Sequence, residues 1–269
     1  MRSSAFVDNV VVITGGSAGI GREIALQLAS QGAILVLAAR DRSVLESTAA
    51  DCRSLGANVL AVPTDVGERS QCERLVSQSV AEFGRLDTLV NNAGISMHAR
   101  FDELGDLDAV DRITRINYLG SVYCTHFALP HLKKTRGRIV AVSSLAGKVG
   151  APTRTVYAAT KHAMAGFFDS LRIELRPDGV SVTVVYPGFV GTDIAERAIG
   201  PDGRLLGQRP VREGDVMTAA ECARRTIGAS ASRSRELIMT PGGKLGQLLR
   251  VLAPRLVDEI AVRAVERGR

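Results

Sequence analysis

Cysteine is scarce in this sequence and is not arranged for disulfide crosslinks or metal binding. The four cysteines lie far apart, with no CxxC pair among them: Cys52, Cys72, Cys124 and Cys222. Scattered cysteines in a chain of 269 residues are typical of reduced, structural thiols in a cytoplasmic protein. His126 and His131 are five residues apart, which is not a ligand spacing on one helix face. We therefore expect a cytoplasmic protein without disulfides and without a metal site.

Long apolar runs and dense basic runs are missing as well. The chain does not open on an apolar segment before a cleavage site, and no later run is long enough to cross a bilayer. The net charge of +6 comes mostly from arginine, yet the basic residues are neither clustered nor interleaved with aromatics, which make up 4% of the chain. This pattern argues against nucleic-acid binding, whereas an excess of arginine suits a phosphorylated small molecule.

The chain does contain a glycine-rich loop between a buried strand and a helix. The β-branched run at 10–14 leads into Gly15-Gly16-Ser17-Ala18-Gly19-Ile20-Gly21, and a helical pattern follows. Glycines let the backbone approach a pyrophosphate, and the free N–H groups at the helix start stabilise it. The spacing is Thr-Gly-x-x-x-Gly-x-Gly, without the Gly-Lys-Ser/Thr of a P-loop. It predicts a dinucleotide site.

The second strand ends at Arg40, which bears on the choice of dinucleotide. A guanidinium at this strand end suits the 2′-phosphate of NADP, whereas NAD-selective proteins place an acidic residue there to bind the ribose. The neighbouring Asp41 is able to take a ribose hydroxyl instead. Asp41 and Ser43 are also helix N-cap candidates, because Ser43 and Glu46 have capping-box spacing. We favour NADP(H) over NAD(H).

Strand and helix patterns alternate along most of the chain. The predicted strands are 10–14, 33–39, 58–63, 86–91, 137–143, 180–186 and 236–240, and the predicted helices after the first are 41–55, 69–83, 107–132, 156–176 and 218–229. No hairpin signal interrupts them, so we expect an α/β fold with a doubly wound parallel sheet. One domain is expected over residues 1–243, with a substrate loop at 193–217, followed by an amphipathic helical extension at 244–269.

Polar residues near the predicted strand ends are the candidates for chemistry. Ser144 stands just beyond a strand, where open α/β sheets bind ligands. Tyr157 and Lys161 lie one helical turn apart, so the ammonium is expected to favour the ionised phenol. Taken alone, such a pair is usually two surface side chains. Asn117 in the middle of a helix either satisfies a local backbone group or has a functional task.

Three further features leave alternatives open. Asp65 either reaches the adenine edge or caps the next helix, and Asn91-Asn92-Ala93-Gly94 forms either a cofactor wall or an ordinary turn. His98 either lines the pocket or is a solvated loop side chain. In the extension, two apolar stripes separated by Pro254 face the body of the protein, a second subunit or a membrane surface.

Together these residues resemble the short-chain dehydrogenase/reductase family in its compact, Rossmann-type form. The resemblance covers about residues 8 to 192, and its motifs appear in order: Thr14-Gly15-x-x-x-Gly19-Ile20-Gly21, Asp65, Asn91-Asn92-Ala93-Gly94, Asn117, Ser144, Tyr157-x-x-x-Lys161 and Pro187-Gly188-x-Val190-x-Thr192. The family's serine stands thirteen positions before its tyrosine, which selects Ser144 over Ser143. Ala18 departs from many NADP-using members, which have a basic residue in the loop, so Arg40 carries the NADP prediction.

The resemblance implies roles for these residues. Tyr157 would be the general acid or base, Ser144 would stabilise the substrate oxygen, Lys161 would bind the nicotinamide ribose and lower the pKa of Tyr157, and Asn117 would hold a water in a proton relay. Val190 and Thr192 would orient the nicotinamide. The whole cofactor site implied by the resemblance is Gly15, Ser17, Gly19, Ile20, Gly21, Arg40, Asp65, Val66, Asn92, Ala93, Gly94, Tyr157, Lys161, Pro187, Gly188, Val190 and Thr192.

The expected function is an NADP(H)-dependent oxidoreductase that transfers a hydride to or from a carbonyl/secondary alcohol substrate. Phe189, the loop at 95–101 and the leucine-rich tail favour a partly hydrophobic substrate. The family implies a homodimer or homotetramer. A catalytically silent NADP(H)-binding sensor or scaffold is the alternative. An epimerase or dehydratase is a third, although such proteins usually carry a larger sugar-nucleotide domain.

Overall fold

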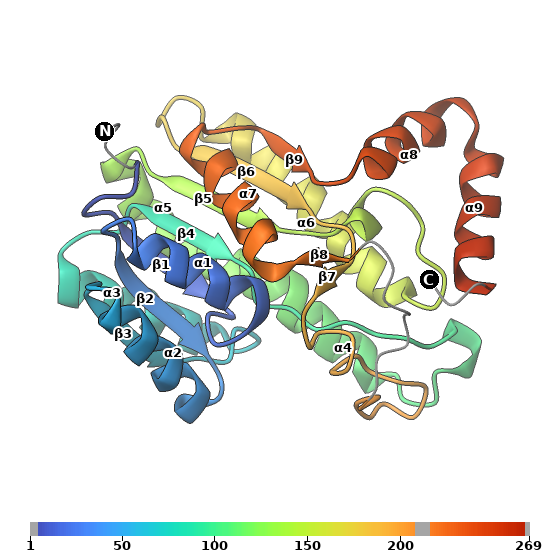
Figure 1. Cartoon of the computed structure of the whole chain (residues 1–269), viewed down its shortest axis with the longest axis horizontal. Coiled ribbons are helices and arrows are strands. Elements are labelled where there is room, and N and C mark those ends of the chain that lie inside the picture. The colour runs from blue at the N-terminus through green and yellow to red at the C-terminus, as the bar shows by residue number, and fades with distance from the viewer. Residues whose placement is uncertain (1–4, 208–215, 267–269) are drawn as a thin grey trace.

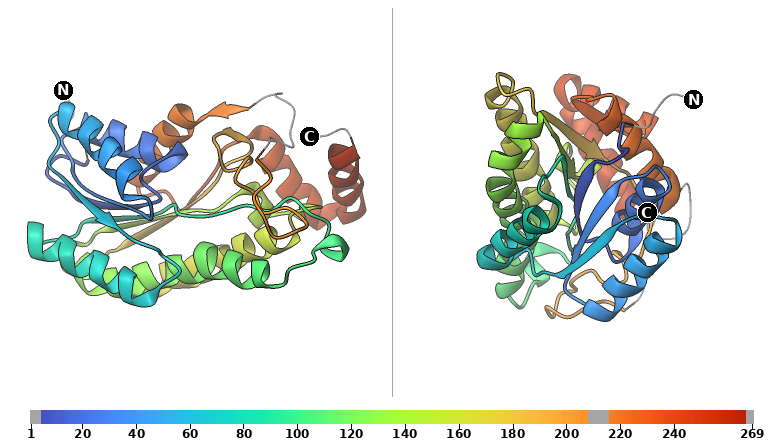
Figure 2. Two further views of the ribbon diagram at one scale, coloured as in Figure 1. Left: turned by 90° about the horizontal axis from the view of Figure 1, so that it is seen from below. Right: turned by 90° about the vertical axis from the view of Figure 1, so that its left-hand side faces the viewer.

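The computed structural model describes residues 5–207 and 216–266. A parallel sheet lies between two layers of helices (Figures 1 and 2). Its seven strands have the spatial order β3-β2-β1-β4-β5-β6-β9, in which every neighbouring pair is parallel. They are β1 (Val10–Thr14), β2 (Ile34–Ala39), β3 (Val59–Pro63), β4 (Thr88–Asn91), β5 (Arg138–Val142), β6 (Ser181–Tyr186) and β9 (Glu236–Ile238). The predicted doubly wound sheet is confirmed.

Helices cover both faces of this sheet. One face is covered by α1 (Gly19–Ala29), α2 (Arg42–Ser54) and α7 (Ala219–Ala231), and the other by α3 (Arg69–Phe83), α5 (Gly120–Thr135) and α6 (Thr155–Glu174). Beyond them lie α4 (Asp108–Thr114) and the terminal helices α8 (Pro241–Leu252) and α9 (Pro254–Glu266). Three short 3-10 or π segments are η1 (Phe101–Glu103), η2 (Arg115–Leu119) and η3 (Leu145–Gly147).

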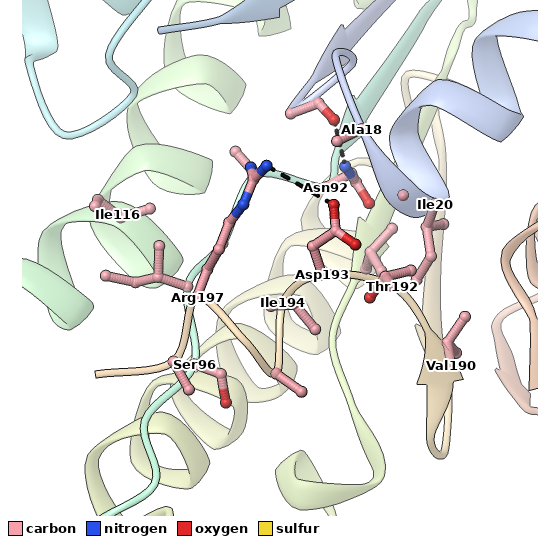
Figure 3. A pocket seen from close by; sticks show the side chains of 18 of the residues that line it. Ala18, Ile20, Asn92, Ser96, Ile116, Val190, Thr192, Asp193, Ile194 and Arg197 are labelled. Atoms are coloured by element: carbon pink, nitrogen blue, oxygen red, sulfur yellow. Dashed lines mark hydrogen bonds and ion pairs between the residues drawn. The ribbon is translucent and has the colours of Figure 1, made fainter. Parts of the chain in front are cut away.

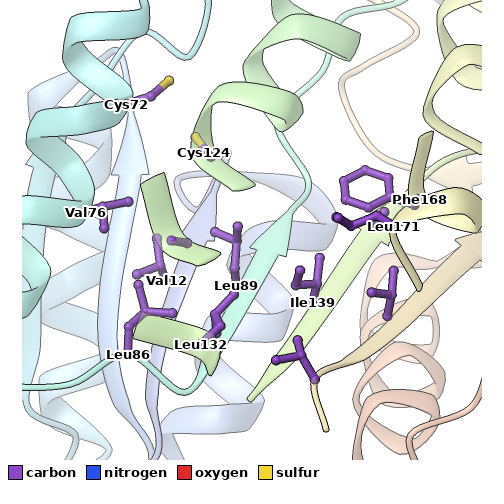
Figure 4. Packing of buried hydrophobic residues seen from close by; sticks show 14 of the residues in the cluster. Val12, Cys72, Val76, Leu86, Leu89, Cys124, Leu132, Ile139, Phe168 and Leu171 are labelled. Atoms are coloured by element: carbon purple, nitrogen blue, oxygen red, sulfur yellow. The ribbon is translucent and has the colours of Figure 1, made fainter. Parts of the chain in front are cut away.

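Alternating residues of β1 supply both halves of the core. Val10 and Val12 pack with the layer of α3, α5 and α6, whereas Val11 and Ile13 pack with α1, α2 and α7. All four side chains are fully buried, as expected for a central parallel strand. Figure 4 shows the first of these clusters, in which the buried Cys72 and Cys124 lie among leucine and isoleucine side chains. All four cysteines are free and buried.

The helix predicted at 107–132 runs without a break from Asp108 to Thr135, but it is not a regular α-helix throughout. It consists of α4, the π-helical η2 and α5, which extends to Thr135. The wide turn lies where Asn117 directs its side chain away from the helix to the backbone of Ile95. Such single-turn π segments are inserted in α-helices at functional sites more often than elsewhere.

The segments after β6 also differ from the prediction. A small second sheet joins β7 (Val190–Gly191) to β8 (Met217–Thr218), which the sequence did not indicate. Residues 208–215 of the predicted substrate loop lie outside the described residues. The preceding segment folds back, with His98 N donating to the carbonyl of Ile199. Helix α8 begins at Pro241, three residues before the predicted extension at 244–269, because Thr240 caps it by accepting from Gly243 N.

The terminal helices leave apolar side chains uncovered. The most exposed are Val251 at 79%, Leu252 at 72% and Leu245 at 56%, and Leu256, Ile260 and Val262 on α9 are exposed too. Helix α8 is tied to the body through Arg250, which contacts the carbonyl of Lys148. None of the described helices is both long enough and apolar enough to span a bilayer.

Gly120, where η2 meets α5, allows a test of this packing. A Cβ there would lie 2.8 Å from Val66 Cγ2 and 2.9 Å from the Val66 carbonyl oxygen. We expect Gly120→Ala to lower the free energy of unfolding by roughly 1–3 kcal/mol through overpacking. The matched control is Gly166→Ala in α6, where a Cβ meets no atom within 4 Å. It should raise stability by about 0.5–1 kcal/mol in the same urea titration, because alanine favours a helix. Equal effects of the two variants would contradict this account.

Candidate active site

The glycine loop leaves free backbone donors at the carboxyl end of β1. Helix α1 begins at Gly19, and its N-cap, Ala18, makes no side-chain capping bond. A Cβ at Gly21 would collide with the carbonyl oxygen of Gly15, so the loop folds this tightly only with glycine there. Uncapped N–H groups at the positive end of a helix form a site for a pyrophosphate. The loop therefore fits a dinucleotide.

Thr14 and Asn92 fix this loop against the end of β4. Thr14 Oγ1 accepts from Asn92 N at 3.0 Å and from Ala93 N at 3.1 Å. Asn92 Nδ2 donates to the carbonyls of Thr14 and Gly15 at 3.0 and 3.2 Å. The predicted cofactor wall and the glycine loop are therefore one hydrogen-bonded unit rather than two independent turns.

The end of β2 presents a free cation. Arg40 is exposed and lines the cleft, and it forms no ion pair with any described residue. Asp41 is the N-cap of α2: its Oδ1 accepts from Ser43 N and Val44 N, and the Ser43 hydroxyl donates to it as well. These bonds lower the pKa of Asp41. Glu46 pairs with Arg53 rather than closing a capping box.

Asp65 lines the same end of the cleft. Its Oδ1 accepts from Gly67 N at 2.9 Å, which closes a turn ahead of α3, and its own N–H donates to Gln71. The carboxylate of Asp65 therefore accepts the backbone hydrogen bond of this turn, and Asp65 still lies at the wall of the cleft.

Asn117 is fully buried behind the cleft. Its Oδ1 accepts from Ile95 N at 2.8 Å, and its Nδ2 donates to the carbonyl of Ile95 at 3.0 Å and to Thr160 Oγ1 at 3.1 Å. Thr160 in turn donates to the carbonyl of Tyr157. Both amide hydrogens are used, so the side chain joins the cleft loop to α6. This is the backbone-satisfying alternative that the sequence left open.

Ser144, Tyr157 and Lys161 come together where β5 ends and α6 begins. Tyr157 is 8% exposed and Lys161 is 3% exposed. Burial raises the pKa of Tyr157, and a side-chain hydrogen bond with Ser144 and the positive charge of Arg154 oppose that rise. The neighbouring Ser143 is engaged elsewhere, because its hydroxyl donates to the carbonyl of Lys161 at 3.1 Å.

The ammonium of Lys161 bonds to the end of β5, close to the phenol. Lys161 Nζ donates to the carbonyl of Val142 at 2.9 Å and lies 5.7 Å from the Tyr157 ring centroid. Burial lowers the pKa of Lys161 to about 8. The pKa of Tyr157 is raised overall, and the cation that opposes the rise is Arg154, which the sequence analysis missed.

The predicted residues surround one cleft of about 1160 Å³, large enough for a dinucleotide and a substrate. Seventeen of the nineteen predicted site residues line it, including Val66, Pro187, Gly188, Val190 and Thr192, whereas Gly21 and Asn117 lie buried behind it. His98 lines it too, together with Arg154 and Arg197, which the sequence analysis did not single out. Figure 3 shows Arg197 reaching toward Asp193, its ion-pair partner at 3.7 Å.

Comparison with known proteins identifies the family. Residues 9–200 match the family model described as short chain dehydrogenase. The chain belongs to the short-chain dehydrogenase/reductase family. It is therefore an oxidoreductase, and the family implies an NAD(P) cofactor, which the glycine loop and the uncapped start of α1 fit. Among the described residues, no cluster of three His, Cys, Asp or Glu side chains is suited to hold a metal ion.

Relatives of this dehydrogenase/reductase include hydroxysteroid dehydrogenase-like proteins. It is 44% identical over 219 residues to the 11-beta-hydroxysteroid dehydrogenase-like 4A of Arabidopsis thaliana, covering 81% of this chain and 72% of that protein. It is 36% identical over 267 residues to 11-beta-hydroxysteroid dehydrogenase 1A of the same plant, covering 95% and 76%. A Burkholderia phymatum short-chain dehydrogenase/reductase crystallised with NAD superposes with a TM-score of 0.84 at 30% identity, covering 95% and 96%.

The buried ammonium of Lys161 makes a stability prediction. We expect Lys161→Met to raise the free energy of unfolding at pH 7 by up to about 3 kcal/mol, because each unit of the lowered pKa costs about 1.4 kcal/mol of charge burial. Between pH 8 and 10.5 the folded protein has lost this proton while the unfolded chain keeps it, so the wild type should regain stability relative to the variant there.

Chemical denaturation at pH 7 and pH 10 measures both effects. The exposed Lys134 gives the control variant Lys134→Met, for which no gain is expected at either pH. A variant at position 161 that folds but is less stable than the wild type at pH 7 would show that the ammonium is stabilising.

Proposed function

We propose that this protein is an NADP(H)-dependent oxidoreductase that interconverts a carbonyl and a secondary alcohol on a partly hydrophobic substrate. The observation that carries the proposal is that Ser144, Tyr157 and Lys161 line the wall of one cleft, with the Tyr157 and Lys161 side chains buried one turn apart on α6. A buried phenol beside a hydroxyl and facing a cofactor-sized cleft is arranged to exchange a proton with a bound substrate.

Each side chain then has a proton-handling or positioning task. Tyr157 donates its phenolic proton to the substrate oxygen in reduction, and Ser144 stabilises the charge that develops on that oxygen. Burial raises the pKa of Tyr157, and in oxidation the same phenolate would accept the proton of the substrate hydroxyl. Lys161 binds the nicotinamide ribose, and Asn117 positions the loop at Ile95 and holds a relay water through its remaining acceptor capacity. The bound nicotinamide supplies or accepts the hydride.

The remaining residues of the predicted cofactor set follow the cleft from end to end. We propose that the glycine loop with Ser17 binds the pyrophosphate, that Asp65 and Val66 border the adenine, and that Asn92, Ala93 and Gly94 form the wall beside the ribose. Pro187, Gly188, Val190 and Thr192 border the nicotinamide at the end of β6. These residues line the same cleft, which supports this assignment of roles.

Arg40 supports NADP over NAD. It has no acidic partner among the described residues, so its guanidinium is available to the 2′-phosphate. Asp41 is occupied as a helix cap and is poorly placed to select the free ribose of NAD. Arg197 also lines this cleft, but its guanidinium pairs with Asp193.

Apolar side chains in the other part of the cleft support a partly hydrophobic substrate. Phe189 is 44% exposed, Leu205 is 65% exposed, and Ile194 and Val216 are also exposed while lining the cleft. A homodimer or homotetramer is proposed because the apolar faces of α8 and α9 are uncovered, and the mass in solution tests it. Concentration-independent monomers that bind lipid vesicles would favour the membrane alternative. Cytoplasmic location stays a prediction from the sequence.

Turnover tests the function. The purified protein should oxidise NADPH in the presence of ketones from a panel graded in size and polarity. Tyr157→Phe should reduce kcat by about 100- to 10,000-fold, because the proton donor is gone, while leaving NADPH binding intact. A protein that binds NADPH but turns over no carbonyl or alcohol of the panel would be the silent sensor instead, particularly if Tyr157→Phe changes nothing.

Cofactor choice is tested separately at Arg40. Arg40→Ala should weaken NADPH binding by about 1.5–3 kcal/mol, the strength of a charge-assisted hydrogen bond, and leave NADH binding nearly unchanged. Fluorescence titration with both nucleotides measures this. An equal loss of affinity for NADPH and NADH would show that Arg40 does not bind the 2′-phosphate.

A further inference from the structure

Arg154 is a half-buried arginine on the substrate side of the cleft. It is the N-cap residue of α6 and lies three residues before Tyr157. Both line the cleft, and the charge of Arg154 acts on the phenol. The glycine loop and Arg40 lie elsewhere along the cleft, at the ends of β1 and β2.

The surroundings of Arg154 hold it in place without neutralising it. Its guanidinium lies over the Phe189 ring, with Cζ 5.0 Å from the centroid. No acidic side chain of residues 5–207 and 216–266 forms an ion pair with it, and burial lowers its pKa. Partly buried arginines are ordinarily paired, because a desolvated charge without a partner is costly.

The backbone next to Arg154 adds to this cost. Thr153 has a φ of +63°, a left-handed conformation that is unfavourable for a β-branched residue. It is held there by a distant segment, since Ala99 N donates to its carbonyl at 2.9 Å and His98 Nδ1 lies 3.4 Å from its hydroxyl. Strain of this kind persists where the surrounding structure fixes it, and it gathers at ligand sites.

A cation beside the helix start is costly as well. The start of α6 is the positive end of its dipole, where an arginine is disfavoured. Burial and the charge of Arg154 both lower the pKa of the nearby His98. A bound anion would offset the cost of burying the guanidinium and its repulsion by the positive end of the α6 dipole.

We propose that Arg154 binds a carboxylate of the substrate, so that the substrate is an apolar ketone or alcohol with a carboxylate group. This rests on the proposed oxidoreductase function and names its substrate class. One planar guanidinium matches one carboxylate through two parallel hydrogen bonds. The apolar side chains of Phe189, Leu205 and Val216 contact the remainder of the molecule, and its carbonyl oxygen reaches Ser144 and Tyr157.

Matched acids and esters test this inference. The probes are 4-acetylbenzoate and 3-(4-acetylphenyl)propanoate, each beside its methyl ester, which has similar size and no charge. The wild type should show a higher kcat/KM for at least one acid than for its ester. Arg154→Gln should lower kcat/KM for that acid by about 10- to 100-fold, mainly through KM, and change the ester by less than threefold. Arg154→Lys should restore part of the loss.

Two controls guard against general damage. Arg176→Gln, an exposed substitution beyond the other end of α6, should leave the ratio of acid to ester unchanged. Binding of NADPH to Arg154→Gln should equal that of the wild type. Calorimetric binding of each acid and ester to the NADP-bound protein gives the same comparison without turnover.

The outcomes separate this inference from the proposed function. Turnover of the esters without any preference for the acids would overturn the carboxylate site and leave the oxidoreductase intact. An equal loss for acid and ester in Arg154→Gln, with a shifted pH profile for the ester, would mean that Arg154 acts on Tyr157 rather than on the substrate. Absence of all turnover would overturn the proposed function, and the calorimetric comparison would still decide the carboxylate site.

Discussion

A reciprocal pair of hydrogen bonds joins the end of β5 to α6, and the geometry of the candidate site depends on it. The ammonium of Lys161 donates to the carbonyl of Val142, and the hydroxyl of Ser143 donates to the carbonyl of Lys161. Because both bonds are buried, water does not compete for them, and each is stronger than it would be at the surface. They fix the distance between the end of β5, two residues before Ser144, and the helix that carries Tyr157.

Much of the fold was predictable because its signals are local. Continuous β-branched runs, glycine spacing and alternating patterns fixed the sheet and most helices within two or three residues. The interruption at η2 was not predicted, although Asn117 was recognised as unfavourable in a helix. Its partners, Ile95 and Thr160, lie 22 and 43 residues away, and no periodicity reports such contacts.

The candidate site was predicted in part for the same reason. Residues at strand ends, such as Arg40 and Ser144, line the cleft as expected, since parallel strands end at one edge. The contacts of the charged groups were not predictable. One-turn spacing suggested Lys161 as the cation near the phenol, but it did not indicate that the ammonium bonds to the carbonyl of Val142 or that the charge of Arg154 acts on Tyr157. The sequence shows that Arg154 lies three residues before Tyr157. It does not show that Arg154 is partly buried, and this burial is what makes the spacing informative.

The π-helical segment η2 also determines how the chain tolerates changes in length. A wide turn holds one residue more than an α-helical turn, so removing one residue from 115–119 would let α4 and α5 run on as one regular helix. That shorter helix would still bury Cys124 against the sheet and Ile113 in the cluster of Met97 and Val156, but it would turn the amide of Asn117 away from Ile95 and Thr160. The same deletion would therefore leave the fold intact and damage the site. It would break the link between the cleft loop and the helix that carries Tyr157.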